Sequence, residues 1–171
     1  MRNLLKFSAV LLFIVAAASS NAQTLKFGHI DLQALVQVMP ERATAETQFN
    51  AFQTEIEEIF AGMQKELQQK YTELEQLGQD ASEIKRNAKI TEVQDLQQRL
   101  QNYQSSAQQQ IQQKYSELLK PVFEKAQKAI EEVAAEKGLL YVFDTGSNVV
   151  LYKSNQSMDV LPLAKEKLGI K

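Results

Sequence analysis

The fold of this chain is decided by residues 52–77, FQTEIEEIFAGMQKELQQKYTELEQL, and by residues 93–122, VQDLQQRLQNYQSSAQQQIQQKYSELLKPV. In both stretches apolar residues recur at steps of three and four, which places them along one stripe of an α-helix. The stripe residues are Phe52, Ile56, Ile59, Met63, Leu67, Tyr71, Leu74 and Leu77, followed by Val93, Leu96, Leu100, Tyr103, Ala107, Ile111, Tyr115, Leu118 and Val122. So narrow a stripe is typical of a coiled-coil seam. The pattern predicts two long helices folded back on each other, with no catalytic motif inside them.

The two stretches are joined by residues 77–82, which carry the residue types of a turn. Gly78 suits the left-handed position that ends a helix. Asp80 followed by Glu83 fits a capping box for the next helix, with aspartate in place of serine or threonine. We therefore expect the chain to reverse here.

The arm is predicted to span residues 40–121. Pro40 suits the first turn of a helix, where its missing N–H is not needed. Pairing about the turn places Pro40 opposite residues 120–121. The flanking segments 23–39 and 122–171 are expected to form one small body that serves as the oligomerisation region.

Three short strands are expected in this body. The first lies at residues 25–30, and the other two, at 139–143 and 148–152, are predicted to pair as a hairpin joined through 144–147. Three short strands leave exposed edges, so we expect several copies of the chain to share a core. The residues expected to mediate this assembly are Phe27, Val142, Val149 and Leu151.

Two short helices complete the body. Asp31 is a plausible N-cap for the first, whose apolar side carries Leu35 and Val36. The second is expected at residues 159–168. The fold class is thus mainly α with a small β part, in which a long helical hairpin projects from a β-rich body.

The chain begins like a secreted protein. Arg2 and Lys6 precede an apolar run at residues 7–18, and a small-x-small cleavage site follows at 20–22. Residues 1–22 are therefore predicted to be a cleaved signal peptide, and the mature chain is expected in the periplasm. The alternative is an uncleaved membrane anchor, but a bilayer span needs roughly 20 apolar residues. Membrane association is expected to be peripheral at most.

The charge of the chain is mildly acidic. It carries 19 Lys and Arg against 21 Asp and Glu side chains, a formal net charge of −2. Removal of Arg2 and Lys6 with the signal peptide leaves 17 basic side chains and a net charge of −4. A general nucleic-acid binder would carry a basic face, so we expect no nucleic-acid partner.

The sequence gives no indication of an enzyme. His29 is the only histidine and there is no cysteine, so neither a metal cluster nor a nucleophile with its base is suggested. We interpret His29 as a structural residue at the end of a strand. A phosphate-binding loop of the type G-x-x-x-x-G-K-S/T is missing too. No catalytic residue, metal or cofactor is predicted.

The surface of the arm is rich in amides. Between residues 64 and 113 there are 15 glutamines, which fit either a solvated helix surface or a surface of weak donors and acceptors for unfolded clients. Near the turn, Lys85, Arg86 and Lys89 are candidates for client contact. A solvated, partly paired helix surface is the alternative interpretation of these three cations.

Short stretches of sequence at both ends of the mature chain are similar to those of a known protein family. They are Phe27-Gly28-His29-Ile30-Asp31-Leu32-Gln33, Met39-Pro40-Glu41, Pro121-Val122-Phe123-Glu124-Lys125-Ala126-Gln127-Lys128-Ala129-Ile130, Glu136-Lys137-Gly138, Tyr141-Val142-Phe143-Asp144 and Val149-Val150-Leu151-Tyr152. On these residues the chain resembles the Skp/OmpH family of periplasmic chaperones. The resemblance implies a homotrimer whose three arms surround a cavity above a β-rich body. It also implies ATP-independent holding of unfolded outer-membrane proteins, which prevents aggregation before membrane insertion.

The chain departs from the best-known family members in its charge. Their arms are basic, whereas here Glu73, Glu75, Asp80 and Glu83 offset the cations near the turn. The resemblance therefore carries no lipopolysaccharide site to this chain. A second class of function also fits the sequence, a non-enzymatic coiled-coil adaptor that spaces or tethers components of the cell envelope.

Overall fold

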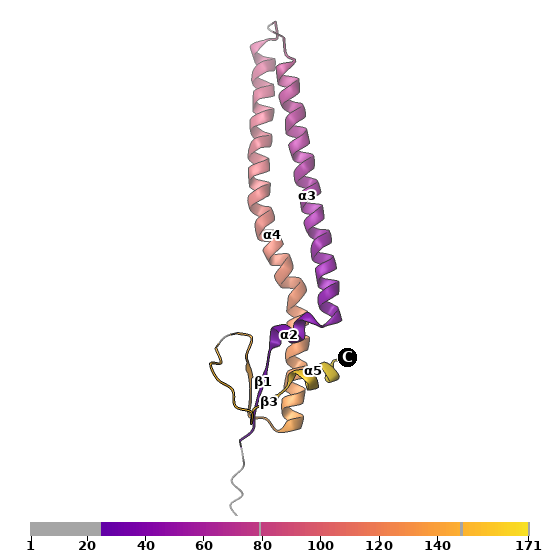
Figure 1. The fold of residues 1–171 in the computed structure, drawn as a ribbon. Coiled ribbons are helices and arrows are strands. Elements are labelled where there is room, and N and C mark those ends of the chain that lie inside the picture. The colour runs from indigo at the N-terminus through magenta and orange to yellow at the C-terminus, as the bar shows by residue number, and fades with distance from the viewer. Residues whose placement is uncertain (1–24, 79, 148, 171) are drawn as a thin grey trace, which may run out of the picture.

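The computed structural model describes residues 25–78, 80–147 and 149–170. It has a long two-helix arm that rises from a small body (Figure 1). In chain order the elements are β1 (Phe27–Ile30), α2 (Leu32–Gln37), α3 (Pro40–Glu75), α4 (Glu83–Lys137), β2 (Tyr141–Asp144), β3 (Met158–Asp159) and α5 (Leu161–Lys167). The predicted mainly-α fold with a small β part is confirmed. The predicted signal peptide, residues 1–22, lies outside the described residues.

The arm consists of α3 and the upper part of α4, packed side by side in opposite directions (Figure 1). The buried seam residues include Ile56, Val93 and Leu96. Lower down, the ring of Phe49 packs edge-on against Tyr115, with centroids 5.1 Å apart. The apolar stripes predicted from the sequence therefore meet in one seam, and the antiparallel hairpin is confirmed.

The first helix of the arm ends earlier than the turn pattern predicts. α3 ends at Glu75, and its C-cap, Gln76, has right-handed geometry. Gly78 is not among the residues with left-handed backbone, so the predicted glycine cap is wrong. The helix instead closes with a hydrogen bond from the N–H of Gln76 to the carbonyl of Thr72 at 2.9 Å.

The second helix begins at a different cap from the one predicted. The hydroxyl of Ser82 accepts a hydrogen bond from the N–H of Lys85 at 3.4 Å, and Glu83 is the first helical residue. A capping side chain must stand directly before the first helical turn to reach its free N–H groups. Asp80 stands too early in the chain for this, so the predicted capping box from Asp80 to Glu83 is wrong.

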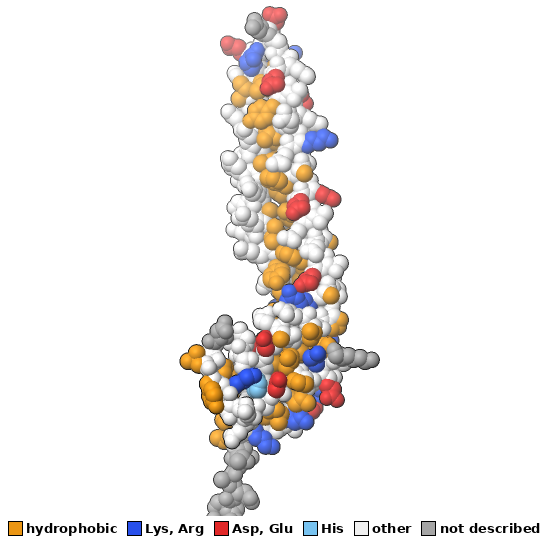
Figure 2. Space-filling view, in the orientation of Figure 1, with side chains coloured by type: hydrophobic (Ala, Val, Ile, Leu, Met, Phe, Trp, Pro, Cys, Tyr) orange, Lys and Arg blue, Asp and Glu red, His pale blue; other side chains and the backbone are white. Residues whose placement is uncertain are grey.

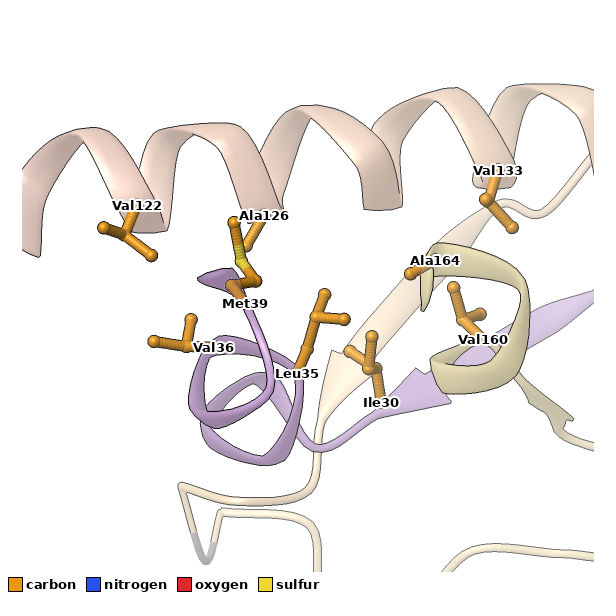
Figure 3. Packing of buried hydrophobic residues seen from close by; sticks show 9 residues of the cluster. All are labelled: Ile30, Leu35, Val36, Met39, Val122, Ala126, Val133, Val160 and Ala164. Carbon is orange, nitrogen blue, oxygen red and sulfur yellow. The ribbon is translucent and has the colours of Figure 1, made fainter. Parts of the chain in front are cut away.

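α4 continues beyond the arm and forms the spine of the body. Pro121 lies inside the helix, where proline removes a backbone hydrogen bond and ordinarily kinks or breaks the helix. The turns that follow Pro121 bury one face of the helix, which stabilises them. The buried cluster of the body consists of Ile30, Leu35, Val36, Met39, Val122, Ala126, Val133, Val160 and Ala164 (Figure 3). Side chains from β1, α2 and α5 thus gather on the lower part of α4.

The two short helices form as the sequence predicts. Asp31 caps α2, because its Oδ1 accepts a hydrogen bond from the N–H of Ala34 at 2.9 Å. Leu35 and Val36, on the predicted apolar side, are fully buried. The helix expected at residues 159–168 is α5.

The three strands form one parallel sheet in the order β2-β1-β3. The register places Phe27 of β1 opposite Tyr141 of β2, and Gly28 opposite Met158 of β3. β1, the first strand in the chain, is thus the central one. Parallel strands need a long crossover between them, and here the connection from β1 to β2 contains the whole arm.

The predicted hairpin between residues 139–143 and 148–152 is wrong. β2 pairs with β1, residues 149–152 form no strand, and residue 148 lies outside the described residues. The third strand of the sheet lies further along the chain, in β3.

The residues after β2 bind the start of α2 instead of reversing the chain. Asp144 Oδ1 accepts hydrogen bonds from the N–H of Leu32 at 3.2 Å and from the N–H of Gly146 at 2.9 Å. The N–H of Thr145 donates to the carbonyl of Ile30 at 2.8 Å. The polar residues that resemble a hairpin turn in the sequence therefore serve to join β2 to β1 and α2.

Candidate interaction surfaces

The sheet has an inner face toward the buried core and an outer face toward solvent. A Cβ placed on Gly28 would lie 2.9 Å from a methyl group of Val160 in the core, so Gly28 is on the inner face. Side chains alternate between the two faces of a strand. The outer face therefore carries Phe27, Tyr141 and Phe143, which we call the aromatic row.

The side chains of the aromatic row pack closely against one another. The rings of Phe27 and Tyr141 are nearly parallel, with 6.4 Å between centroids, and those of Tyr141 and Phe143 lie 6.0 Å apart. Tyr141 is nevertheless 61% exposed and Phe143 46% exposed. The row is thus ordered by its own contacts while its outward side faces water.

A segment at residues 149–157 flanks the aromatic row. Between the segment and the row is a hollow of about 380 Å³, whose walls include Phe27 and Phe143. The segment exposes further apolar side chains, and Leu151 is 97% exposed. Figure 2 shows hydrophobic side chains gathered at this edge of the body. We call the whole surface the apolar face; its members are Leu25, Phe27, Tyr141, Phe143, Val149, Leu151 and Tyr152.

The residues predicted to mediate assembly do not all lie on this surface. Phe27, Val149 and Leu151 belong to the apolar face, whereas Val142 points to the inner face and packs against the core. The prediction misses the two neighbours of Val142 in β2, which belong to the aromatic row. Strand alternation could have found them, because neighbours of an inward residue must point outward.

His29 lies on the outer face of β1 but is only 8% exposed. Its Nδ1 shares a hydrogen bond of 2.9 Å with the hydroxyl of Ser157. Its backbone carbonyl accepts a hydrogen bond from the N–H of Val160, also at 2.9 Å. These contacts hold the end of the 149–157 segment against the sheet, so the side chain of His29 has a structural role.

Four charged side chains meet across the arm near its turn, and we call them the tip charge cluster. Lys89 Nζ of α4 lies 2.7 Å from a Glu73 oxygen and 3.0 Å from a Glu92 oxygen. Lys70 Nζ of α3 lies 2.8 Å from Glu92 and 3.6 Å from Glu73. Each lysine contacts both carboxylates, so the cluster favours a single register of α3 against α4.

The tip charge cluster shifts the pKa of all four groups. The hydrogen bond from Lys89 lowers the pKa of Glu73, and hydrogen bonds from Lys70 and then Lys89 lower the pKa of Glu92. The hydrogen bond to Glu92 raises the pKa of Lys70, and the hydrogen bonds to Glu73 and Glu92 raise the pKa of Lys89. All four directions favour the charged forms at neutral pH.

The three cations proposed for client contact have different surroundings. Lys89 belongs to the tip charge cluster. The guanidinium of Arg86 donates a hydrogen bond to the carbonyl of Gly78 at 3.2 Å, which holds the turn. Lys85 is exposed. The geometry of Lys89 and Arg86 fits the alternative interpretation, a partly paired helix surface.

At the base of the arm a hollow of about 390 Å³ lies between α3 and α4. Ala45 of α3 and Pro121 and Val122 of α4 form part of its wall. Lys125 forms an ion pair with Glu41 at its rim. The ion pair therefore links α3 to α4 at the level where the hollow interrupts their apolar contact.

Within residues 25–78, 80–147 and 149–170, no three His, Cys, Asp or Glu side chains gather as a metal site would require. No helix in the same part of the chain is both long and apolar enough to cross a membrane.

Comparisons with known proteins agree with this architecture. The sequence model of the family "Outer membrane protein (OmpH-like)" matches residues 26–168. No curated protein matches the chain. Among solved structures, the chain is similar to a crystal structure from Caulobacter crescentus that is provisionally described as an outer membrane chaperone (OmpH-like). The TM-score is 0.72 at 11% sequence identity, over 86% of each chain. With its family model matched from β1 to the end of α5, the chain belongs to the OmpH-like outer membrane protein family.

Proposed function

We propose that this chain is an ATP-independent periplasmic holdase chaperone. It binds unfolded outer-membrane proteins in a cavity between helical arms and prevents their aggregation before membrane insertion. The observation that carries the proposal is a long helical arm on a small body whose apolar face is uncovered in the single chain. Membership of the OmpH-like family supports it, as does the structural likeness to a protein provisionally described as an outer membrane chaperone.

Assembly is the first step of the proposed mechanism. Large contiguous apolar surfaces on soluble proteins mark interaction sites, and the apolar face contains seven large side chains. We propose that copies of the chain join through this face as a homotrimer. The arms then stand around a common space, in which a client is kept away from other unfolded chains.

Capture in this space needs no nucleotide. Each contact between an arm and an unfolded chain is weak, but contacts on several arms act together and raise the overall affinity. Individual contacts still break quickly, so the client stays free to leave for the membrane. The holding function thus follows from the length and separation of the arms, without a catalytic step.

The experiment is dilution of a urea-unfolded outer-membrane β-barrel protein into buffer with and without the purified chain. Light scattering should show suppressed aggregation at a severalfold molar excess of the assembled chaperone. Unchanged aggregation at that excess would rule the holdase out. Crosslinking in cells then separates the holdase, which should capture many unfolded β-barrel proteins, from an adaptor with one folded partner.

A further inference from the structure

The two helices of the arm differ in their charge. From Leu100 to Gln113, α4 contains no charged residue. The positions of this segment outside the seam are all exposed, and all are Gln, Asn or Ser: Gln101, Asn102, Gln104, Ser105, Ser106, Gln108, Gln109, Gln110, Gln112 and Gln113. We call them the amide surface. They cover about four turns of helix, or roughly 20 Å at 1.5 Å per residue.

The acidic charge at this height is on the other helix. The hydroxyl of Tyr103 donates a hydrogen bond to the carbonyl of Ile56 at 3.4 Å, so this part of α3 lies directly across the seam. Its exposed residues include Glu55, Glu57 and Glu58. The net negative charge of the chain is therefore kept off the amide surface.

The amide surface lies on the same side of the arm as the apolar face of the body. Figure 1 places the sheet and the segment after β2 on the α4 side, with α3 on the far side of α4. Figure 2 shows the middle of this flank of the arm as white, without acidic or basic side chains. If copies join through the apolar face, the α4 helices border the common space and the α3 helices face outward.

We propose that the amide surface is the lining that contacts the client, and that its ligand is an extended, unfolded polypeptide with unpaired backbone amide groups. This inference rests on the proposed function and deepens it. A side-chain amide has two N–H donors and a carbonyl acceptor. It can therefore form hydrogen bonds with both the carbonyl and the N–H groups of an unfolded backbone. Among the described residues, the side chains of Gln101, Gln109 and Gln112 form no hydrogen bond within the chain, whereas Gln110 donates to Ser106 at 2.8 Å.

A folded protein is a poor match for this surface. Stable interfaces depend on a few desolvated anchors, mostly aromatic or arginine side chains, and the exposed positions of the amide surface provide none. An unfolded chain needs no anchor of this kind, because its own backbone presents donors and acceptors along its length. Neutral groups also bind without regard to the charge of the client, and salt does not screen them as it screens ion pairs.

The test measures affinity for one probe, a fluorescently labelled, urea-unfolded outer-membrane β-barrel protein, at about 50 mM and 500 mM NaCl. The variant Gln101→Ala/Gln109→Ala/Gln112→Ala removes three free amides from α4. The matched control Gln64→Ala/Gln68→Ala/Gln69→Ala removes three exposed amides from α3. Both sets replace good helix formers by alanine, the best one. Circular dichroism and molecular mass verify that both variants fold and assemble.

We expect the α4 variant to bind about tenfold more weakly, since each hydrogen bond contributes modestly, and the α3 variant to change less than about twofold. Wild-type affinity should change less than about twofold between the two salt concentrations. Equal losses in both variants, a steep fall in affinity with salt, or an altered mass of the α4 variant would each overturn the assignment. If the wild-type protein fails to bind the probe at all, it is the holdase function that fails.

Discussion

At the scale of single residues, the packing of the body depends on the absence of a side chain at Gly28. A Cβ at this position would lie 2.8 Å from Leu139, 2.9 Å from Val160 and 3.3 Å from Val142. Two of these contacts are below 3.0 Å and come from different residues, so one rotamer change cannot relieve both. The glycine therefore lets β1 lie directly against the residues that follow α4 and β3.

We predict that Gly28→Ala destabilises the protein by about 1–3 kcal/mol, the usual cost of overpacking a filled core. Urea unfolding followed by circular dichroism measures the change. The control is Gly62→Ala in α3, where the new Cβ would meet nothing within 4 Å beyond its own stretch of helix. Since alanine is the better helix former, the control should be more stable than wild type by up to about 1 kcal/mol. A Gly28→Ala variant as stable as wild type would contradict this account of β1.

At the scale of secondary-structure elements, α3 and α4 are held together by an apolar seam along the arm and by ion pairs at both of its ends. The tip charge cluster holds α3 and α4 together near the turn, and the ion pair of Lys125 with Glu41 does so at the base. Exposed ion pairs add little to stability. Their effect is on register, because a slip of one helix along the other would separate the partners.

The tip charge cluster predicts an acid response of the arm. The pKa of Glu73 and of Glu92 is lowered in the folded state from its ordinary value of 4.5. Carboxylates of this kind add stability above their unfolded pKa, and this stability is lost as the pH falls through the folded pKa. We therefore expect the register of the two helices near the turn to loosen as the pH falls below 4.5, and to stay fixed between about pH 6 and 8.

Distances between spin labels on α3 and α4 near the turn would measure this loss of register. The control variant Lys70→Gln/Lys89→Gln removes the partners that lower both pKa values, so its tip should not loosen in acid. The lysines have the opposite dependence. Their raised pKa gives stability that is present below 10.5 and lost as the pH rises through the folded value. A tip that loosens equally in wild type and control would show that the cluster does not hold it.

At the scale of the whole molecule, the body presents the apolar face on the α4 side of the arm. The proposed assembly forms through this face. The proposed client space then depends on whether the assembly places α4 toward its centre. Val142, which the sequence predicts to mediate assembly, lies on the inner face of the sheet, so Val142→Asp would disturb the buried core. The exposed members of the apolar face are better probes.

We predict that Tyr141→Asp converts the oligomer to single chains. A charge at this position would be desolvated in the interface, which is costly without a partner. Light scattering measures the mass, and circular dichroism verifies the fold. Ile84→Asp is the control, since Ile84 is a large apolar residue, 83% exposed, near the turn of the arm. This variant should keep the native mass. A folded Tyr141→Asp protein of native mass would exclude the apolar face as the interface.

Parts of the fold that depend on local pattern can be predicted from the sequence. The seam residues, the cap at Asp31 and the helix at the C-terminal end are of this kind, because helix periodicity and capping involve residues close together in the chain. The turn was less well predicted. Ser82 and Asp80 are both good capping residues, and the choice between them depends on where α4 begins.

The long hairpin arm, the mainly helical class and the family resemblance can be predicted from the sequence, because they depend on spacing and residue type along the chain. The pairing of the sheet became clear from the folded structure alone. Its parallel pairing joins residues as distant as Gly28 and Met158, 130 positions apart, so no local pattern specifies it. The tertiary structure also decided which residues of β2 face outward and on which side of the arm the uncharged surface of α4 lies. Both follow from how the strands and helices pack on the lower half of α4, because that packing sets the direction in which each side chain points.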